Sequence, residues 1–289
     1  MDPFNKIGVF LTDGPADDAV LGFAGHIARA GVSHLSCIHI RGEHATVADT
    51  DAAAFETRVR DRLAGDVTLE VQTGSVIADA LKSARDKDLD LVLMGRYLPS
   101  SQLGLGARMT RLARKCPCSV MTIPDHCRPH FSRILVAVDG SRHSTLSMST
   151  ALALAAAAGD AQPQLLVQTV RHVDPRHDLA GVTFEESADA QREHGRKALE
   201  RFMADIDTQG TSVETVVSLA ETPARAIVEL ATARKMDIVV VGSRGATAAA
   251  AAILGSVSEE VLATCAMPVL IVKEKGETLR LLEALFSMD

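Results

Sequence analysis

The chain has 289 residues, of which 47% are hydrophobic, 23% charged and only 3% aromatic, with no Trp and one Tyr. This length exceeds what a single hydrophobic core usually serves, so we expect two domains. The formal net charge of −7 argues against a broad surface for nucleic acid or anionic membrane, because both need clustered Lys and Arg.

The sequence predicts neither a secretory signal nor a membrane span, because it has no basic stretch leading into a long apolar run and no eighteen consecutive apolar residues. The five cysteines are odd in number and scattered, as is typical of reduced thiols. We therefore expect a cytoplasmic protein.

The two halves of the chain repeat the same landmarks in the same order. IGVFLTDG near the N-terminus matches RILVAVDGS at 133–141, and DLDLVLMG ending at Gly95 matches KMDIVVVG ending at Gly242. Each half then closes with a helix and a strand, at 111–124 and 260–273. Three ordered matches indicate a duplication.

Strands and helices alternate in the second half. We predict strands at 133–138, 164–170, 212–218, 237–242 and 268–272, and helices at 143–158, 184–209, 222–235 and 257–265. Apolar runs such as ILVAV and VLIV are typical of strands buried on both faces of a parallel sheet.

The predicted fold class is therefore α/β, with two tandem doubly wound domains, each a five-stranded parallel sheet flanked by helices. We expect the domains at 1–125 and 131–275. The short polar linker between them predicts close packing about a pseudo-twofold axis. The tail, 276–289, has apolar residues at helical spacing and predicts a docked helix.

A candidate phosphate loop follows the strand that ends at Gly242. The sequence GSRGATAAAAAILGSVSEEVL has the pattern G-x2-G-x9-G-S, set by Gly242, Gly245, Gly255 and Ser256. Ligands of open parallel sheets bind beyond the carboxyl ends of the strands. Gly242 would let the backbone approach a ligand, and the helix that opens at Gly255-Ser256 would offer free N–H groups to phosphate. The hydroxyls of Ser256 and Ser258 and the cation of Arg244 could add contacts.

Each of these residues also has an explanation without a ligand. Ser256 and Glu259 could form a capping box, glycines at strand ends often serve turns alone, and Asp139 could cap a helix. The loop interior is rich in alanine, which favours helix and predicts a weaker phosphate site.

The second half resembles the universal stress protein family of the ATP-binding type, over essentially all of residues 131–273. ILVAVDGS, DIVVVGSRG, GSVSEEVL and MPVLIV carry the resemblance. It implies an ATP site with the adenine between the ends of the first and second strands. By resemblance, Ala137, Val138 and Asp139 line the adenine and ribose, Val170 meets the adenine through its backbone, Gly242 lies near the ribose, and Gly245, Gly255, Ser256 and Val257 hold phosphates.

The first half is expected to have lost this site. Its loop from Gly95 to Gly106 is shorter, Leu98 stands for the second glycine, Pro99 stiffens the turn, and Ala107 stands for the serine. Arg96, Arg108 and Arg111 could still attract an anion. We interpret this half as a degenerate domain kept for packing.

Two further clusters invite a functional interpretation. Cys116-Pro117-Cys118, with His126, Cys127 and His130, could suggest zinc, but one intervening residue is tighter than structural zinc sites use, and we expect no metal ligands here. His172, Asp174, His177 and Asp178 are more typical of a solvated loop near the ligand than of general acid–base chemistry.

The sequence thus predicts a stress or signalling protein that binds ATP, or ADP or AMP, with Mg²⁺ in its second half. A scaffold without nucleotide is the alternative, and a slow ATPase or ATP-using enzyme is a weaker one, because no nucleophile or general base is recognisable. Expected partners are the nucleotide and the other half of the chain. Association of two chains into a homodimer is a further alternative.

Overall fold

The computed structural model describes residues 4–29, 34–41, 52–63, 65–96, 104–156, 162–172, 183–245 and 254–276. The predicted helix in the tail and the alanine-rich stretch 246–253 lie outside these residues. The elements of the N-terminal half are β1 (Lys6–Leu11), α1 (Asp17–Ala28), β2 (His34–Arg41), α2 (Ala52–Arg60), β3 (Val67–Thr73), α3 (Val76–Asp86), β4 (Leu91–Arg96), α4 (Gly104–Lys115) and β5 (Ser119–Pro124).

The C-terminal half repeats this alternation. Its elements are β6 (Arg133–Ala137), α5 (Arg142–Ala156), β7 (Gln164–Arg171), α6 (Phe184–Ala204), β8 (Ser212–Leu219), α7 (Pro223–Ala233), β9 (Ile238–Gly242), α8 (Ser256–Thr264) and β10 (Val269–Val272). The predicted elements of this half agree with these in type and order. Among the described residues, no helix is both long and apolar enough to cross a membrane.

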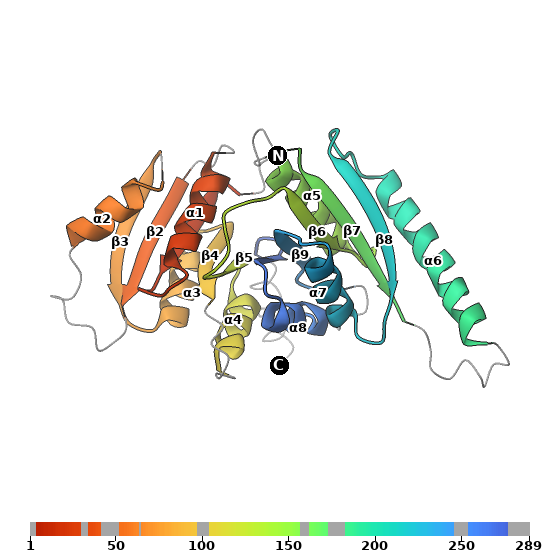
Figure 1. Ribbon diagram of the computed structural model, residues 1–289. Coiled ribbons are helices and arrows are strands. Elements are labelled where there is room, and N and C mark those ends of the chain that lie inside the picture. Colours follow the sequence, from red (N-terminus) through yellow and green to blue (C-terminus); the bar gives the residue numbers. More distant parts are fainter. Residues whose placement is uncertain are drawn as a thin grey trace.

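The ten strands of the described residues form one sheet with the order β3-β2-β1-β4-β5-β10-β9-β6-β7-β8 (Figure 1). Within each half the strands run parallel, in the same order counted outward from the centre. This confirms the predicted doubly wound α/β class with five parallel strands per half.

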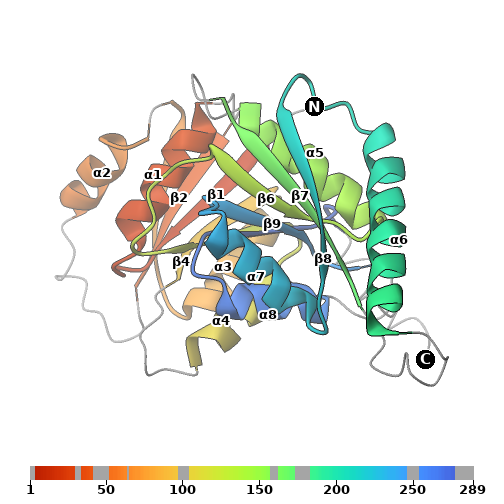
Figure 2. The same ribbon diagram turned by 45° about the vertical axis from the view of Figure 1, so that its right-hand side comes forward.

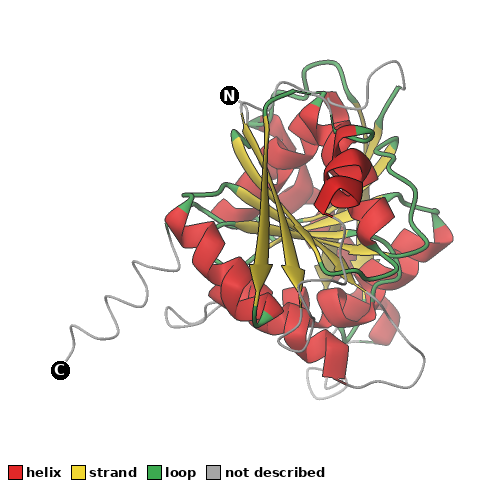
Figure 3. Cartoon of the chain, turned by 90° about the vertical axis from the view of Figure 1, so that its left-hand side faces the viewer, coloured by secondary structure: helices red, strands yellow, loops and turns green. Residues whose placement is uncertain are grey.

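Helices cover both faces of the sheet, as Figures 2 and 3 show. One apolar core lies under α1, α2, α5 and α6, and a second lies under α3, α4, α7 and α8. The central strands face both cores, which explains why their sequences are almost continuously apolar.

The two halves join where β5 pairs with β10, the one antiparallel pair among the described strands. Met121 lies opposite Leu270, Val120 opposite Ile271, and Thr122 opposite Val269. β5 and β10 are the equivalent last strands of the two repeats, so this register is symmetric about the Met121–Leu270 pair. The halves are therefore related by an approximate twofold axis at the seam.

The structure corrects the alignment of the two halves by one residue. The sequence pairs Asp13 with Asp139, but Asp13 and Gly140 share the left-handed backbone, with φ of 56° and 82°. In both halves, a side chain of the next helix then accepts the backbone N–H of the preceding residue: Asp17 accepts from Thr12 at 3.1 Å, and Ser144 accepts from Asp139 at 2.9 Å. Thr12 is therefore the counterpart of Asp139.

Each half also places a cation at the end of a helix of the other half. Arg96, 1% exposed, donates to the carbonyl oxygens of Leu262, Cys265 and Met267 at the C-terminus of α8. Lys273, just after β10, donates to the carbonyl of Cys116 at 2.8 Å, at the C-terminus of α4. Cations are favoured there because the last carbonyls of a helix lack intrahelical partners.

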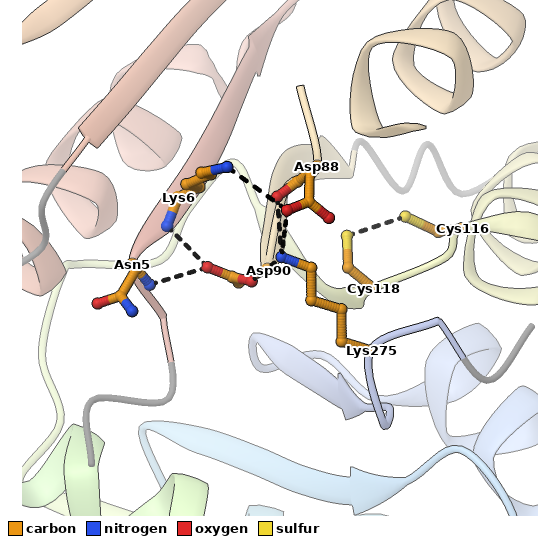
Figure 4. A network of polar contacts seen from close by, with 7 residues as sticks. All are labelled: Asn5, Lys6, Asp88, Asp90, Cys116, Cys118 and Lys275. Carbon is orange, nitrogen blue, oxygen red and sulfur yellow. Dashed lines mark hydrogen bonds and ion pairs between the residues drawn. The ribbon is translucent and has the colours of Figure 1, made fainter. Parts of the chain in front are cut away.

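Polar contacts extend this interface beyond the strands (Figure 4). Lys275 lies 2.9 Å from a carboxylate oxygen of Asp88 and 2.7 Å from one of Asp90. Asp90 also accepts the backbone N–H groups of Asn5 and Lys6 at 3.0 and 2.9 Å. The segment after β10 is thus tied to the start of β1 and the turn before β4.

Candidate functional site

A cavity of about 530 Å³ opens at the carboxyl ends of β6, β7 and β9. The chain passes from β6 to β7 and β8 on one side, and then returns to β9 on the other side of β6. The cavity therefore lies at the point where the strand order reverses, which is the usual ligand position in open parallel sheets. Its volume falls within the range of small-molecule sites.

All eleven predicted site residues line this one cavity: Ala137, Val138, Asp139, Val170, Gly242, Arg244, Gly245, Gly255, Ser256, Val257 and Ser258. Seven further residues also line it: Ser144, Gln168, Arg171, Pro223, Ile227, Val241 and Leu254. Most of these come from β7, α5 and α7, outside the loop motif that carried the sequence argument.

The first turn of α8 forms the polar end of the cavity. Gly255 is the N-cap, and its N–H donates to the carbonyl of Ser243 at 2.7 Å. The first N–H groups of a helix have no intrahelical acceptor, so those of Ser256, Val257 and Ser258 are available to an anion.

The capping box proposed for Ser256 and Glu259 is wrong. Ser256 is the first helical residue rather than the cap, and no side chain caps this helix. Glu259 instead accepts two hydrogen bonds from Arg114 of α4, at 2.5 and 2.6 Å. Glu259 therefore joins α8 to the N-terminal half.

The two serines of this turn differ in what their hydroxyls can offer. Ser258 is buried, and its hydroxyl donates to the carbonyl of Gly242 at 2.6 Å, which ties α8 to the end of β9. Ser256 is exposed at the cavity. Of the two, Ser256 is better placed to donate to a ligand.

Asp139 organises the loop between β6 and α5. Its Oδ1 accepts the N–H of Ser141 at 3.0 Å and the hydroxyl of Ser144 at 2.8 Å. The alternative structural role, in which Asp139 holds the start of the helix, is therefore present in the geometry. Its Oδ2 faces Gly245, where an added Cβ would lie 2.6 Å away.

Gly242 serves helix packing. A Cβ at Gly242 would lie 2.7 Å from Cβ of His143 on α5, and one at Gly95 would lie 2.7 Å from Cβ of Ala16, at the equivalent place in the N-terminal half. Because the half with the degenerate loop keeps the same contact, the glycine is explained without a ligand.

Apolar side chains also line the cavity. They belong to Ala137, Val170, Pro223, Ile227 and Leu254, from β6, β7, α7 and the residue before the α8 cap. The cavity therefore combines an apolar slot with a cluster of helix N–H groups, an arrangement that fits a flat heterocycle joined to an anionic group.

Larger side chains occupy the corresponding place in the N-terminal half. Phe10, fully buried, stands where Ala137 lies, and Ile40 stands where Val170 lies. Both belong to the core under α3 and α4. The predicted obstacles Leu98 and Pro99 lie outside the described residues, as does the side chain of Ala107. Phe10 therefore gives an independent reason why the space at this place differs between the two halves.

The structure describes the other two clusters only in part. Cys116 and Cys118 are buried with their sulfurs 3.4 Å apart (Figure 4), and no group of three potential metal ligands occurs in the part of the chain that the structure covers. His172 is exposed. Asp174, His177 and Asp178 lie outside the described residues.

The fold and the cavity define a doubly wound α/β protein with a ligand-type cavity in its C-terminal repeat. Residues 130–273 match the model of the "Universal stress protein family". A universal stress protein of Thermus aquaticus is 37% identical over 50% of this chain and 99% of its own length. The chain belongs to the universal stress protein family.

Solved structures extend the likeness in fold to the whole chain. A functionally unknown protein from Pseudomonas aeruginosa has a TM-score of 0.70 at 20% identity, covering 99% of this chain and 98% of its own. A universal stress protein solved in complex with cAMP is 28% identical over 50% of this chain and 98% of its own, with a TM-score of 0.34.

Proposed function

We propose that the C-terminal half binds an adenine nucleotide, ATP or else ADP or AMP, together with Mg²⁺, and that this chain is a nucleotide-responsive stress or signalling protein of the cytoplasm. The observation that carries the proposal is that all eleven predicted site residues line one cavity, which combines apolar side chains with the N-terminus of α8.

The anionic end of the ligand would lie against the first turn of α8. The N–H groups of Ser256 and Val257 and the positive end of the helix dipole favour phosphate there, and Arg244 supplies a cation at the cavity. The heterocycle would lie between Val170 and Ile227. A side chain at Gly245 would enter the space between Asp139 and the loop, which explains why a glycine is needed there.

Ser256→Asp tests the phosphate end with opposite effects on binding and stability. A carboxylate in the first turn favours the helix by a few tenths of a kcal/mol, but it repels phosphate. We expect wild-type protein to bind Mg-ATP in isothermal titration calorimetry, and the variant to bind at least about tenfold more weakly with an unlowered Tm.

Ser75→Asp is the matched control. Ser75 is the exposed N-cap of α3 in the N-terminal half, also without a side-chain cap bond, so the charge change is the same but remote from the cavity. Its affinity should equal that of wild type. Absence of binding by wild-type protein at millimolar Mg-ATP would contradict the proposal and favour a scaffold without nucleotide.

A further inference from the structure

The wall of the cavity contains a buried amide that its own surroundings satisfy only in part. Gln168 lies on β7 and is 0% exposed. Its Nε2 donates to the hydroxyl of Ser218 at 2.8 Å and to the carbonyl of Ala226 at 3.3 Å. Its Oε1 is buried and has no hydrogen-bond partner among the described residues.

The orientation of this amide follows from its neighbours. The carbonyl of Ala226 can only accept a hydrogen bond, so the nitrogen must face it and the oxygen must face elsewhere. Both hydrogens of Nε2 are then used. Leaving a buried acceptor unpaired lowers the free energy of unfolding by about 1–3 kcal/mol. Core packing by itself therefore does not explain a glutamine at position 168.

The N-terminal half shows what the core alone accepts at this position. Ala137 pairs with Gln168 in the sheet, and its counterpart Phe10 pairs with Ile38. Ile38 is fully buried in an apolar core. The polar residue therefore occurs in the half in which this position lines the cavity.

We propose that Gln168 is a specificity-determining residue, which selects a heterocycle that carries an amino group over one that carries an oxo group. Its Oε1 accepts a hydrogen bond from the exocyclic amino group of a 6-aminopurine. A 6-oxopurine presents an acceptor at that position and leaves Oε1 unpaired. This inference rests on the proposed nucleotide site and adds the residue that recognises the base.

Calorimetric titration of the full chain with three magnesium nucleotides tests it. ATP carries the amino group, ITP carries an oxo group, and purine riboside triphosphate carries neither, while ribose and phosphates are the same. We expect wild-type protein to bind ATP at least about tenfold more tightly than the other two, the ratio that one hydrogen bond of about 1.4 kcal/mol gives.

Gln168→Leu should bring the three affinities within about twofold of each other by weakening ATP alone, and Gln168→Met serves if the Leu variant does not fold. Thr169→Val is the matched control, because Thr169 is also buried on β7 but points to the other face of the sheet. It should keep the wild-type preference.

Three outcomes overturn the inference. If wild-type protein binds the three nucleotides equally, or if the Leu and Met variants keep the preference for ATP, Gln168 does not select the base, and the proposed nucleotide site still stands. If wild-type protein binds none of them, the proposed function fails and the inference fails with it.

Discussion

The two halves use different side chains to hold the loop before their first helix. Asp17 occupies the place that Ser144 holds in the C-terminal half, and both accept a backbone N–H from the loop before the helix. Asp17 is 1% exposed, and burial raises its pKa to about 6, an effect that the N–H of Thr12 opposes in part. A carboxylate in this place thus costs free energy that a serine does not.

Asp17→Asn should therefore change the pH dependence of stability. The folded pKa lies above the unfolded value, so the folded state binds more protons between about pH 4 and 6. The free energy of unfolding is therefore not reduced by Asp17 below about pH 4, where its carboxyl is protonated in both states. It falls as the pH rises through about 6, where the buried carboxyl must ionise. We expect the variant to gain about 3 kcal/mol relative to wild type between pH 4 and pH 7.

Urea denaturation at both pH values measures this gain. Asp18→Asn is the control, because the side chain of Asp18 is 62% exposed and no burial cost is relieved there. An equal gain for both variants would show that burial of Asp17 is not the cause.

The eleven predicted site residues belong to short segments around strand ends and one helix start. The loop pattern and the family resemblance, both read from such short segments, therefore named residues that line one cavity, and their role in binding stays a prediction. Gln168, Pro223 and Ile227 were missed because their place in the cavity depends on how α7 packs on β7. The error of one residue at Asp13 arose because an Asp-Gly pair occurs in both halves, whereas the backbone conformation aligns Asp13 with Gly140.

At the scale of elements, helix and strand types were predictable, and some ends were not. The helix predicted at 184–209 ends at Ala204. Asp207 accepts the N–H of Gln209 at 2.9 Å, and Gln209 and Gly210 are left-handed, so a local turn competes with further helix. Such turns involve a single side chain and are weak signals in sequence.

The element that most affects the site is α8, which is held from the other half at two places. Arg114 binds Glu259 near its start, and Arg96 binds three carbonyls at its end. Figure 1 shows α4 and α8 side by side where the halves meet. The N-terminal half therefore positions the helix whose first turn forms the polar end of the cavity.

Arg96→Met should lower the free energy of unfolding by about 3 kcal/mol or more, because it leaves buried carbonyls without a donor. It should also weaken Mg-ATP binding, since α8 is then less firmly placed. Urea denaturation and calorimetric titration measure the two effects. Arg111→Met, an exposed arginine on α4, is the control, and equal losses in both variants would contradict this role of Arg96.

At the scale of the whole molecule, duplication and close packing of the halves were predictable, but their union into one sheet was not. The pairing of β5 with β10 joins strands about 150 residues apart along the chain, and backbone pairing between strand edges leaves little trace in side-chain patterns. The reciprocal placement of Arg96 and Lys273 could likewise be found only in three dimensions.

This shared sheet predicts that the halves unfold together. Differential scanning calorimetry should give one transition in which the calorimetric and van't Hoff enthalpies agree. The double variant Arg96→Met, Lys273→Met should resolve two transitions, because two of the ties between the halves are removed. Two transitions in wild-type protein would show that the seam does not couple the halves.

The seam between β5 and β10 joins two halves of one chain, and this affects how many ligands one molecule can hold. In an assembly of two identical subunits, any substitution appears on both sides of the axis. Here the sides are encoded separately, so Phe10 can fill one cleft while Ala137 leaves the other open. A saturated chain should then carry a single nucleotide, with a simple hyperbolic isotherm. The N-terminal half can accept substitutions without loss of that nucleotide site.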